Sequence, residues 1–139
     1  MYQLAKGLID VNVEDFAYVV ETEKSFEEAS VSVLRAVEQK GWAVFNVIDI
    51  GERLSSKGFD QKPLKLIEMC NGKHANTFLN KSRYVSLFMP CRINIMEENG
   101  KIKIATMRAS VMSQFFPEVV AEEAMAVEKA VIEIIDNAK

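Results

Sequence analysis

The dipeptide Asn99-Gly100 constrains the fold more than any other feature of this 139-residue chain. Both residue types accept a positive φ, so the pair favours a two-residue turn between two antiparallel strands. Such a turn pairs Ile95 with Ile104 and directs four side chains to one face: Ile93, Ile95, Ile102 and Ile104. The sequence therefore predicts a hairpin whose first strand is Cys91–Glu98, with Cys91 pointing towards the core.

Other segments predict strands that alternate with helices. Strands are expected in four segments rich in β-branched or aromatic residues: 16–22, 42–49, 64–69 and 84–89. Ser25 and Glu28 form a capping box, which predicts a helix over about 26–40. Further helical segments are expected at three places: a turn at 51–58, a short helix after Asn71 and a long helix from Pro117 onward, with Val120, Ala124, Val127, Val131 and Ile134 on its apolar face. The order predicts an α+β domain with a mainly antiparallel sheet backed by two main helices.

Length and composition predict one globular domain over residues 1–139, with residues 1–15 as an N-terminal extension. Charged residues interrupt the apolar positions of that extension, so no signal peptide or membrane span is expected. Two cysteines do not make a disulfide framework. The sequence therefore predicts a cytoplasmic protein; a mature exported form that has lost its signal is the alternative.

Charge is distributed unevenly along the chain, whose net charge is −3. Residues 61–113 carry nine Lys or Arg against three Asp or Glu, whereas residues 118–136 carry six acids and only Lys129 as a base. The basic segment suits a small anionic ligand or the acidic helix of a partner subunit. An acidic chain without Lys/Arg runs argues against nucleic-acid binding, and no membrane partner is expected.

Two of the expected strands point beyond the monomer. Segments 42–48 and 84–89 are apolar on both faces, and two helices can cover only one side of a sheet. A second copy of the chain is the commonest cover for the other side, so we expect a homodimer.

Several short motifs resemble one family. They are Gly41-Trp42, the run from Pro63 to Asn71, Lys73-His74-Ala75, Arg83-Tyr-Val-Ser86 and Met89-Pro-Cys-Arg-Ile93. Over residues 16–138 the chain is similar to the domain of unknown function 302 family, in its cysteine-bearing branch. The resemblance implies a curved sheet like that of a TATA-binding-protein repeat and a dimer, and it implies no activity. The chain departs from that branch at Gly72, where proline is typical.

The two cysteines and the lone histidine are the candidate site. Cys70, His74 and Cys91 offer two thiolates and an imidazole, which suit zinc, or copper(I) if Met69 or Met89 joins them. Alternatively, Cys70 and Cys91 form a reversible disulfide in a thiol-dependent redox protein. Both can also be small apolar packing residues.

An anion pocket is another possibility for the same region. The backbone amides from Asn71 to Lys73 and the side chains of Lys73, Arg83 or Arg92 can hold a phosphate or carboxylate. No nucleotide-binding loop, nucleophile elbow or histidine-based triad is present in the sequence, so enzymatic activity is not expected.

Cys70 is the more reactive of the two thiols in this interpretation. A helix that begins at Asn71, together with Lys73, is expected to lower the pKa of Cys70 below about 8.5, the value of a free thiol. The hypothesis is a ligand- or metal-binding protein centred on Cys70 and Cys91.

Overall fold

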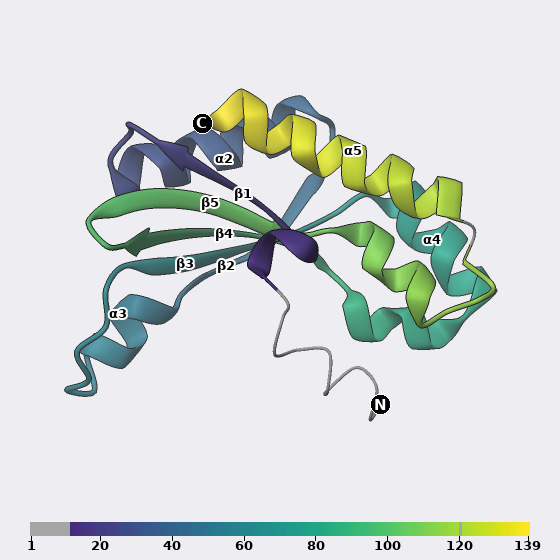
Figure 1. Cartoon of the computed structure of the whole chain (residues 1–139), viewed down its shortest axis with the longest axis horizontal. Helices are drawn as coiled ribbons and strands as arrows, with labels where there is room; N and C mark the ends of the chain where they lie inside the picture. Colours follow the sequence, from purple (N-terminus) through teal and green to yellow (C-terminus); the bar gives the residue numbers. More distant parts are fainter. Residues whose placement is uncertain (1–11, 120) are drawn as a thin grey trace.

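The computed structural model describes residues 12–119 and 121–139, and their strands form one antiparallel sheet (Figure 1). The five strands lie in the order β1-β5-β4-β3-β2, and every neighbouring pair is antiparallel. Their bounds are Ala17–Thr22 for β1, Ala43–Asp49 for β2, Leu64–Cys70 for β3, Cys91–Glu98 for β4 and Lys101–Met107 for β5. The predicted α+β class is confirmed.

The hairpin between β4 and β5 has the predicted turn and register. Asn99 and Gly100 adopt φ values of 54° and 77°, and Ile95 lies opposite Ile104. Ile93, Ile95 and Ile104 have no exposed surface. The hairpin therefore supplies the middle of the core.

Two long helices, α2 (Phe26–Gln39) and α5 (Ala121–Ala138), lie together over one face of the sheet (Figure 1). The capping box is confirmed: the Ser25 side chain accepts a hydrogen bond from the Glu28 amide, and the Glu28 carboxylate accepts one from the Ser25 amide. Val33 and Val37 on α2 are fully buried, as is Ile134 on α5. Burial of these apolar side chains against the sheet is the main force that holds the layers together.

Two shorter helices lie beside the sheet. α3 (Ile50–Ser55) joins β2 to β3, and α4 (Gly72–Lys81) follows β3 directly. Three 3-10 helices complete the described chain: η2 (Val13–Asp15), η3 (Arg83–Phe88) and η4 (Ala109–Gln114). None of the helices in the described part of the chain is long and apolar enough to cross a membrane.

One predicted strand is wrong, and the predicted final helix is present but begins later than expected. Residues 84–89 are not a strand: Tyr84 to Phe88 belong to η3, and Met89 is its C-cap. Val85 is buried and Phe88, three residues later, is half-buried, whereas Tyr84 and Leu87 are largely exposed. That three-residue spacing matches a 3-10 helix rather than the two-residue alternation of a strand. The final helix begins at Ala121 rather than Pro117, and Val120 lies outside the described residues. The expected extension at 1–15 also lies outside them as far as residue 11.

The other face of the sheet carries a row of half-buried side chains. Strand register aligns one residue from each of the five strands on this face: Val19, Ala105, Asn94, Leu66 and Ile48. Neither α2 nor α5 lies on this side (Figure 1). Four of the five side chains are apolar, so this face has an apolar stripe that runs across the whole sheet.

Candidate functional site

The two cysteines lie at the same end of the sheet but on opposite faces. Cys91 is opposite Met69 in the β3–β4 pair, and Met69 is fully buried beneath the helices. Cys91 therefore packs against the core, as predicted. Cys70 is the next residue after Met69, so strand alternation directs it to the other face.

The structure does not bring Cys70, His74 and Cys91 into one metal-binding cluster. Within residues 12–119 and 121–139, no three His, Cys, Asp or Glu side chains are placed to hold a metal ion. His74 lies instead against Trp42, with 6.1 Å between the ring centroids. These residues do not fit zinc or copper(I), which need several ligands that converge on one point.

The predicted helix after Asn71 is confirmed, but the anion pocket is divided. Asn71 caps α4, and its side-chain oxygen accepts a hydrogen bond from the His74 amide at 3.1 Å. Lys73 and His74 line a hollow of about 240 Å³ between α4 and α5. Arg92 lies elsewhere, on β4, and its Nη2 is 3.5 Å from Glu68 Oε2. Arg92 and Lys73 therefore do not line the same hollow.

The predicted lowering of the Cys70 pKa is wrong. Partial burial raises the pKa of Cys70, since removal from water disfavours the thiolate. Burial, together with the neighbouring Cys70, raises the pKa of Cys91 to about 11. Both side chains are therefore neutral thiols near neutral pH.

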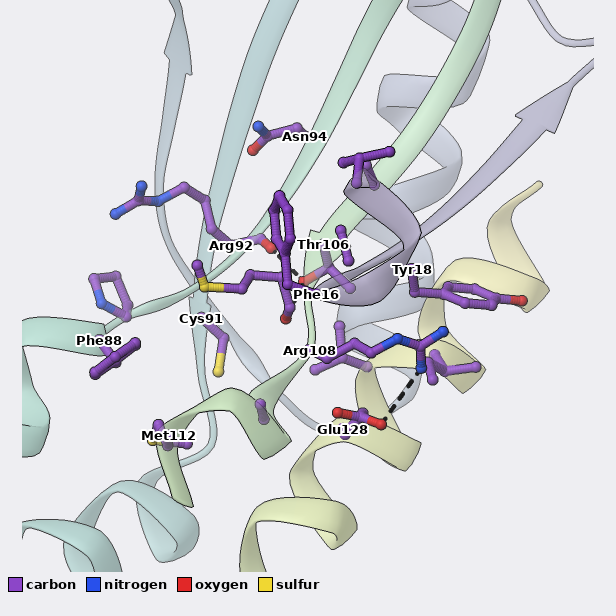
Figure 2. A pocket seen from close by; sticks show the side chains of 18 of the residues that line it. Phe16, Tyr18, Phe88, Cys91, Arg92, Asn94, Thr106, Arg108, Met112 and Glu128 are labelled. Atoms are coloured by element: carbon purple, nitrogen blue, oxygen red, sulfur yellow. Dashed lines mark hydrogen bonds and ion pairs between the residues drawn. The ribbon is translucent and has the colours of Figure 1, made fainter. Parts of the chain in front are cut away.

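A cavity lies where β1 and β4 begin and β5 ends, close to α5 (Figure 2). Its volume is about 500 Å³. Many of the side chains that line it are apolar, among them Phe16, Phe88, Met112, Val131 and Ile132. Cys91, Arg92, Thr106, Arg108 and Glu128 add polar groups to these walls. Of the predicted site residues, the cavity brings together Cys91 and Arg92.

Glu128 is the most deeply buried ionisable side chain of this cavity, with 7% of its surface exposed. Its Oε1 accepts hydrogen bonds from the Ser110 amide at 3.0 Å and from the Ser110 hydroxyl at 2.6 Å. Its Oε2 is 3.4 Å from Arg108 Nη1 (Figure 2). The buried carboxylate is thus compensated by three donors, and it ties α5 to the start of η4.

Arg108 also contacts an aromatic ring at the edge of the sheet. Its guanidinium carbon is 5.6 Å from the centroid of Tyr18, a distance at which a cation is attracted to the ring face. The Tyr18 hydroxyl donates a hydrogen bond to Asp136 at 2.5 Å, and this bond is the main reason why the pKa of Tyr18 is raised. The hydrogen bond to Asp136 therefore holds the Tyr18 ring in place beside the Arg108 guanidinium.

Sequence reasoning missed Tyr18, Arg108 and Glu128. Glu128 did carry a signal: it lies four residues after Ala124 and three before Val131, both on the predicted apolar face of the final helix. A carboxylate on such a face is unusual without a buried partner. The sequence gives no comparable signal for Arg108, because its partners Tyr18 and Glu128 are distant in the chain.

Comparisons with known proteins agree with the fold. The family described as Domain of unknown function DUF302 matches residues 18–138. A similar solved structure is the crystal structure of an uncharacterized conserved DUF302 protein from Bacillus stearothermophilus, with a TM-score of 0.84 and 26% identity. The match covers 89% of this chain and 98% of that chain. No curated protein matches this chain. The protein belongs to the DUF302 family.

Proposed function

We propose that the protein is a binding module for a small organic ligand, which occupies the cavity between the end of the sheet and α5. The observation that carries this proposal is the cavity itself, with a volume of about 500 Å³ and mainly apolar walls. Small-molecule sites have volumes of about 300–1,000 Å³ and combine apolar walls with a few polar groups that orient the ligand. The cavity at the sheet end has both properties.

The proposal moves the site away from the pair of cysteines. Cys91 remains part of the wall, but as a neutral thiol it is a weak nucleophile and a poor metal ligand at neutral pH. Cys70 and Cys91 also point to opposite faces of the sheet, an arrangement that does not favour a redox-active disulfide between them.

A neutral fluorescent probe, N-phenyl-1-naphthylamine, tests the proposal. We expect its emission to rise saturably on binding, since the cavity removes it from water. Ala109→Phe places a ring in the cavity wall and is expected to weaken probe binding at least fivefold. Ala121→Phe makes the same change on an exposed position of α5 that lines neither this cavity nor the hollow beside α4, and is the matched control. Equal loss in both variants, or no saturable binding, would contradict the proposal.

We also propose that a second copy of the chain covers the apolar stripe of Val19, Ala105, Asn94, Leu66 and Ile48. Charges flank the stripe in both signs, with Lys103 and Glu98 2.7 Å apart on one side and Arg92 paired with Glu68 on the other. A two-fold interface requires such a self-complementary surface. This proposal now depends on the open face alone, because residues 84–88 form a 3-10 helix.

Light scattering at micromolar concentration tests the dimer. We expect about twice the chain mass of 15.7 kDa, and Leu66→Lys is expected to shift the protein towards one chain mass because it places a charge in the stripe. Val31→Lys, on an exposed position of α2, is the control. A mass near that of one chain for the unmodified protein would contradict the proposal.

A further inference from the structure

We propose that the ligand of this cavity is an amphipathic carboxylate, whose anionic group binds Arg108 and whose apolar body lies along Phe88, Met112 and α5. This inference rests on the proposed function and adds the chemical class of the ligand. Its first support is the charge of the walls. Arg92 and Arg108 contribute two cations to the lining, whereas Glu128 contributes one carboxylate.

Arg108 has donors left for an anion. Among residues 12–119 and 121–139, its one side-chain hydrogen bond is the 3.4 Å contact from Nη1 to Glu128, and about a third of the side chain is exposed. A guanidinium carries five N–H donors in a planar fork that can hold two carboxylates. Glu128 depends less on this bond, because Ser110 provides it with two shorter ones. A ligand carboxylate can therefore bind Arg108 without displacing Glu128.

Arg92 is less suited to the same role. Its side chain extends away from Arg108 and from Glu128, as Figure 2 shows, and half of it is exposed. Its guanidinium is engaged with Glu68, which does not line the cavity. A ligand carboxylate at Arg92 would have to compete with Glu68 for the guanidinium. The geometry thus favours Arg108 as the group that recognises the anion.

The apolar walls beside Arg108 accommodate the rest of the molecule. Phe88, Met112, Val131 and Ile132 line the part of the cavity under the helices, and Met112 is a side chain that adapts to irregular shapes. Cys91, as a neutral thiol, adds a further weakly polar surface there. A carboxylate with an alkyl or aryl body matches a cavity that has Arg108 at one end and apolar side chains at the other.

Competition against N-phenyl-1-naphthylamine distinguishes this inference from the proposed function. Decanoate and 2-naphthoate represent alkyl and aryl acids, and decanol is the neutral control of the same chain length. We expect decanoate or 2-naphthoate to displace the probe at concentrations at least tenfold below those needed for decanol. Whichever of the two acids competes more strongly shows whether the apolar part of the ligand is alkyl or aryl. Equal potency of acid and alcohol overturns the inference and leaves the cavity proposal intact. Failure of the probe itself to bind overturns both.

Two substitutions test the role of Arg108 with opposite signs. Glu128→Gln removes the competing carboxylate and keeps an oxygen for Ser110, so decanoate binding is expected to strengthen several-fold while decanol binding stays the same. Arg108→Gln combined with Glu128→Gln removes both charges together, so that no buried charge lacks a partner, and decanoate is expected to lose at least tenfold.

Two single substitutions provide the comparison. Arg35→Gln, on the exposed surface of α2, makes the same chemical change outside the cavity and is expected to have no effect. Arg92→Gln is expected to weaken decanoate binding less than the double variant does. A larger loss from Arg92→Gln, or weaker decanoate binding by Glu128→Gln, would overturn the assignment of the anion to Arg108.

Discussion

Cys91 lies directly opposite Met69 across β3 and β4, so Cys91 faces the helices whereas Cys70, one residue beyond Met69, faces away from them. A disulfide needs Cβ atoms that point towards each other over about 4 Å. Residues on opposite faces of a sheet do not meet this condition without movement of the backbone. The two thiols are therefore expected to react independently of each other in the folded protein.

Oxidation is expected to leave the two cysteines unpaired within one chain. After treatment with diamide, the native protein should show no intramolecular disulfide by non-reducing peptide mapping. Unfolding in urea before oxidation is the control, since an unfolded chain can bring the two sulfurs together. A Cys70–Cys91 peptide obtained from the native protein would instead support the redox alternative.

Alkylation is expected to label Cys70 faster than Cys91. Burial raises both thiol pKa values, but it raises that of Cys91 to about 11, and Cys91 packs against the core. Iodoacetamide labelling near pH 8, followed by mass spectrometry, should modify Cys70 first and both more slowly than a free thiol. Faster labelling of Cys91 would show that the cavity exposes its sulfur more than this structure indicates.

Stability is expected to fall at alkaline pH because of Cys91. The folded pKa of Cys91 is about 11 against about 8.5 for a free thiol, so the folded state retains the proton that the unfolded state loses. The contribution is fully present below about pH 8.5 and is lost as the pH rises to about 11, by up to about 3 kcal/mol for this difference in pKa. Urea unfolding between pH 8 and 11 measures it. Cys91→Ala should show a shallower decline than the unmodified protein, and an identical decline would contradict the prediction.

Gly72→Pro is expected to stabilise the protein by about 0.4–1 kcal/mol. Gly72 is the first residue of α4, a position that favours proline, and its φ is not positive. Asn71 before it has φ −108° and ψ 114°, an extended conformation that a following proline accepts. Urea unfolding compares it with Gly72→Ala, which meets open space. A loss of stability in the proline variant alone would show that the Gly72 amide is needed for a hydrogen bond.

Local sequence signals predicted the elements whose residues act within a few positions of one another. Asn99-Gly100 fixed the hairpin register, Ser25 with Glu28 the start of α2, and Asn71 the start of α4. In each of these, the turn or cap chemistry and the apolar pattern agree. Such agreement between local and global preferences is what makes a segment predictable.

The segment around Tyr84 shows why composition alone was insufficient. Its β-branched and aromatic residues favour a strand, yet the buried Val85 and the half-buried Phe88 lie three residues apart. Spacing rather than residue type carried the correct information there. The same is true of Glu128, whose place on the apolar face of α5 was visible in the sequence.

The cavity could not be predicted from local sequence patterns, because its walls come from segments that are far apart in the chain. Phe16 and Tyr18 precede β5 by more than eighty residues, and Glu128 follows it. No spacing rule relates such positions. Only the pairing of β1 with β5 and the packing of α5 bring them together.

This construction couples occupancy of the cavity to the folding of the whole chain. Since β1, the central hairpin and α5 all contribute wall residues, the cavity exists only when the domain has closed around both ends of its sequence. A ligand that binds the folded state alone then stabilises it by about 1.4 kcal/mol for each tenfold excess over its dissociation constant. A rise in melting temperature thus becomes a sensor for ligands whose identity is not known in advance.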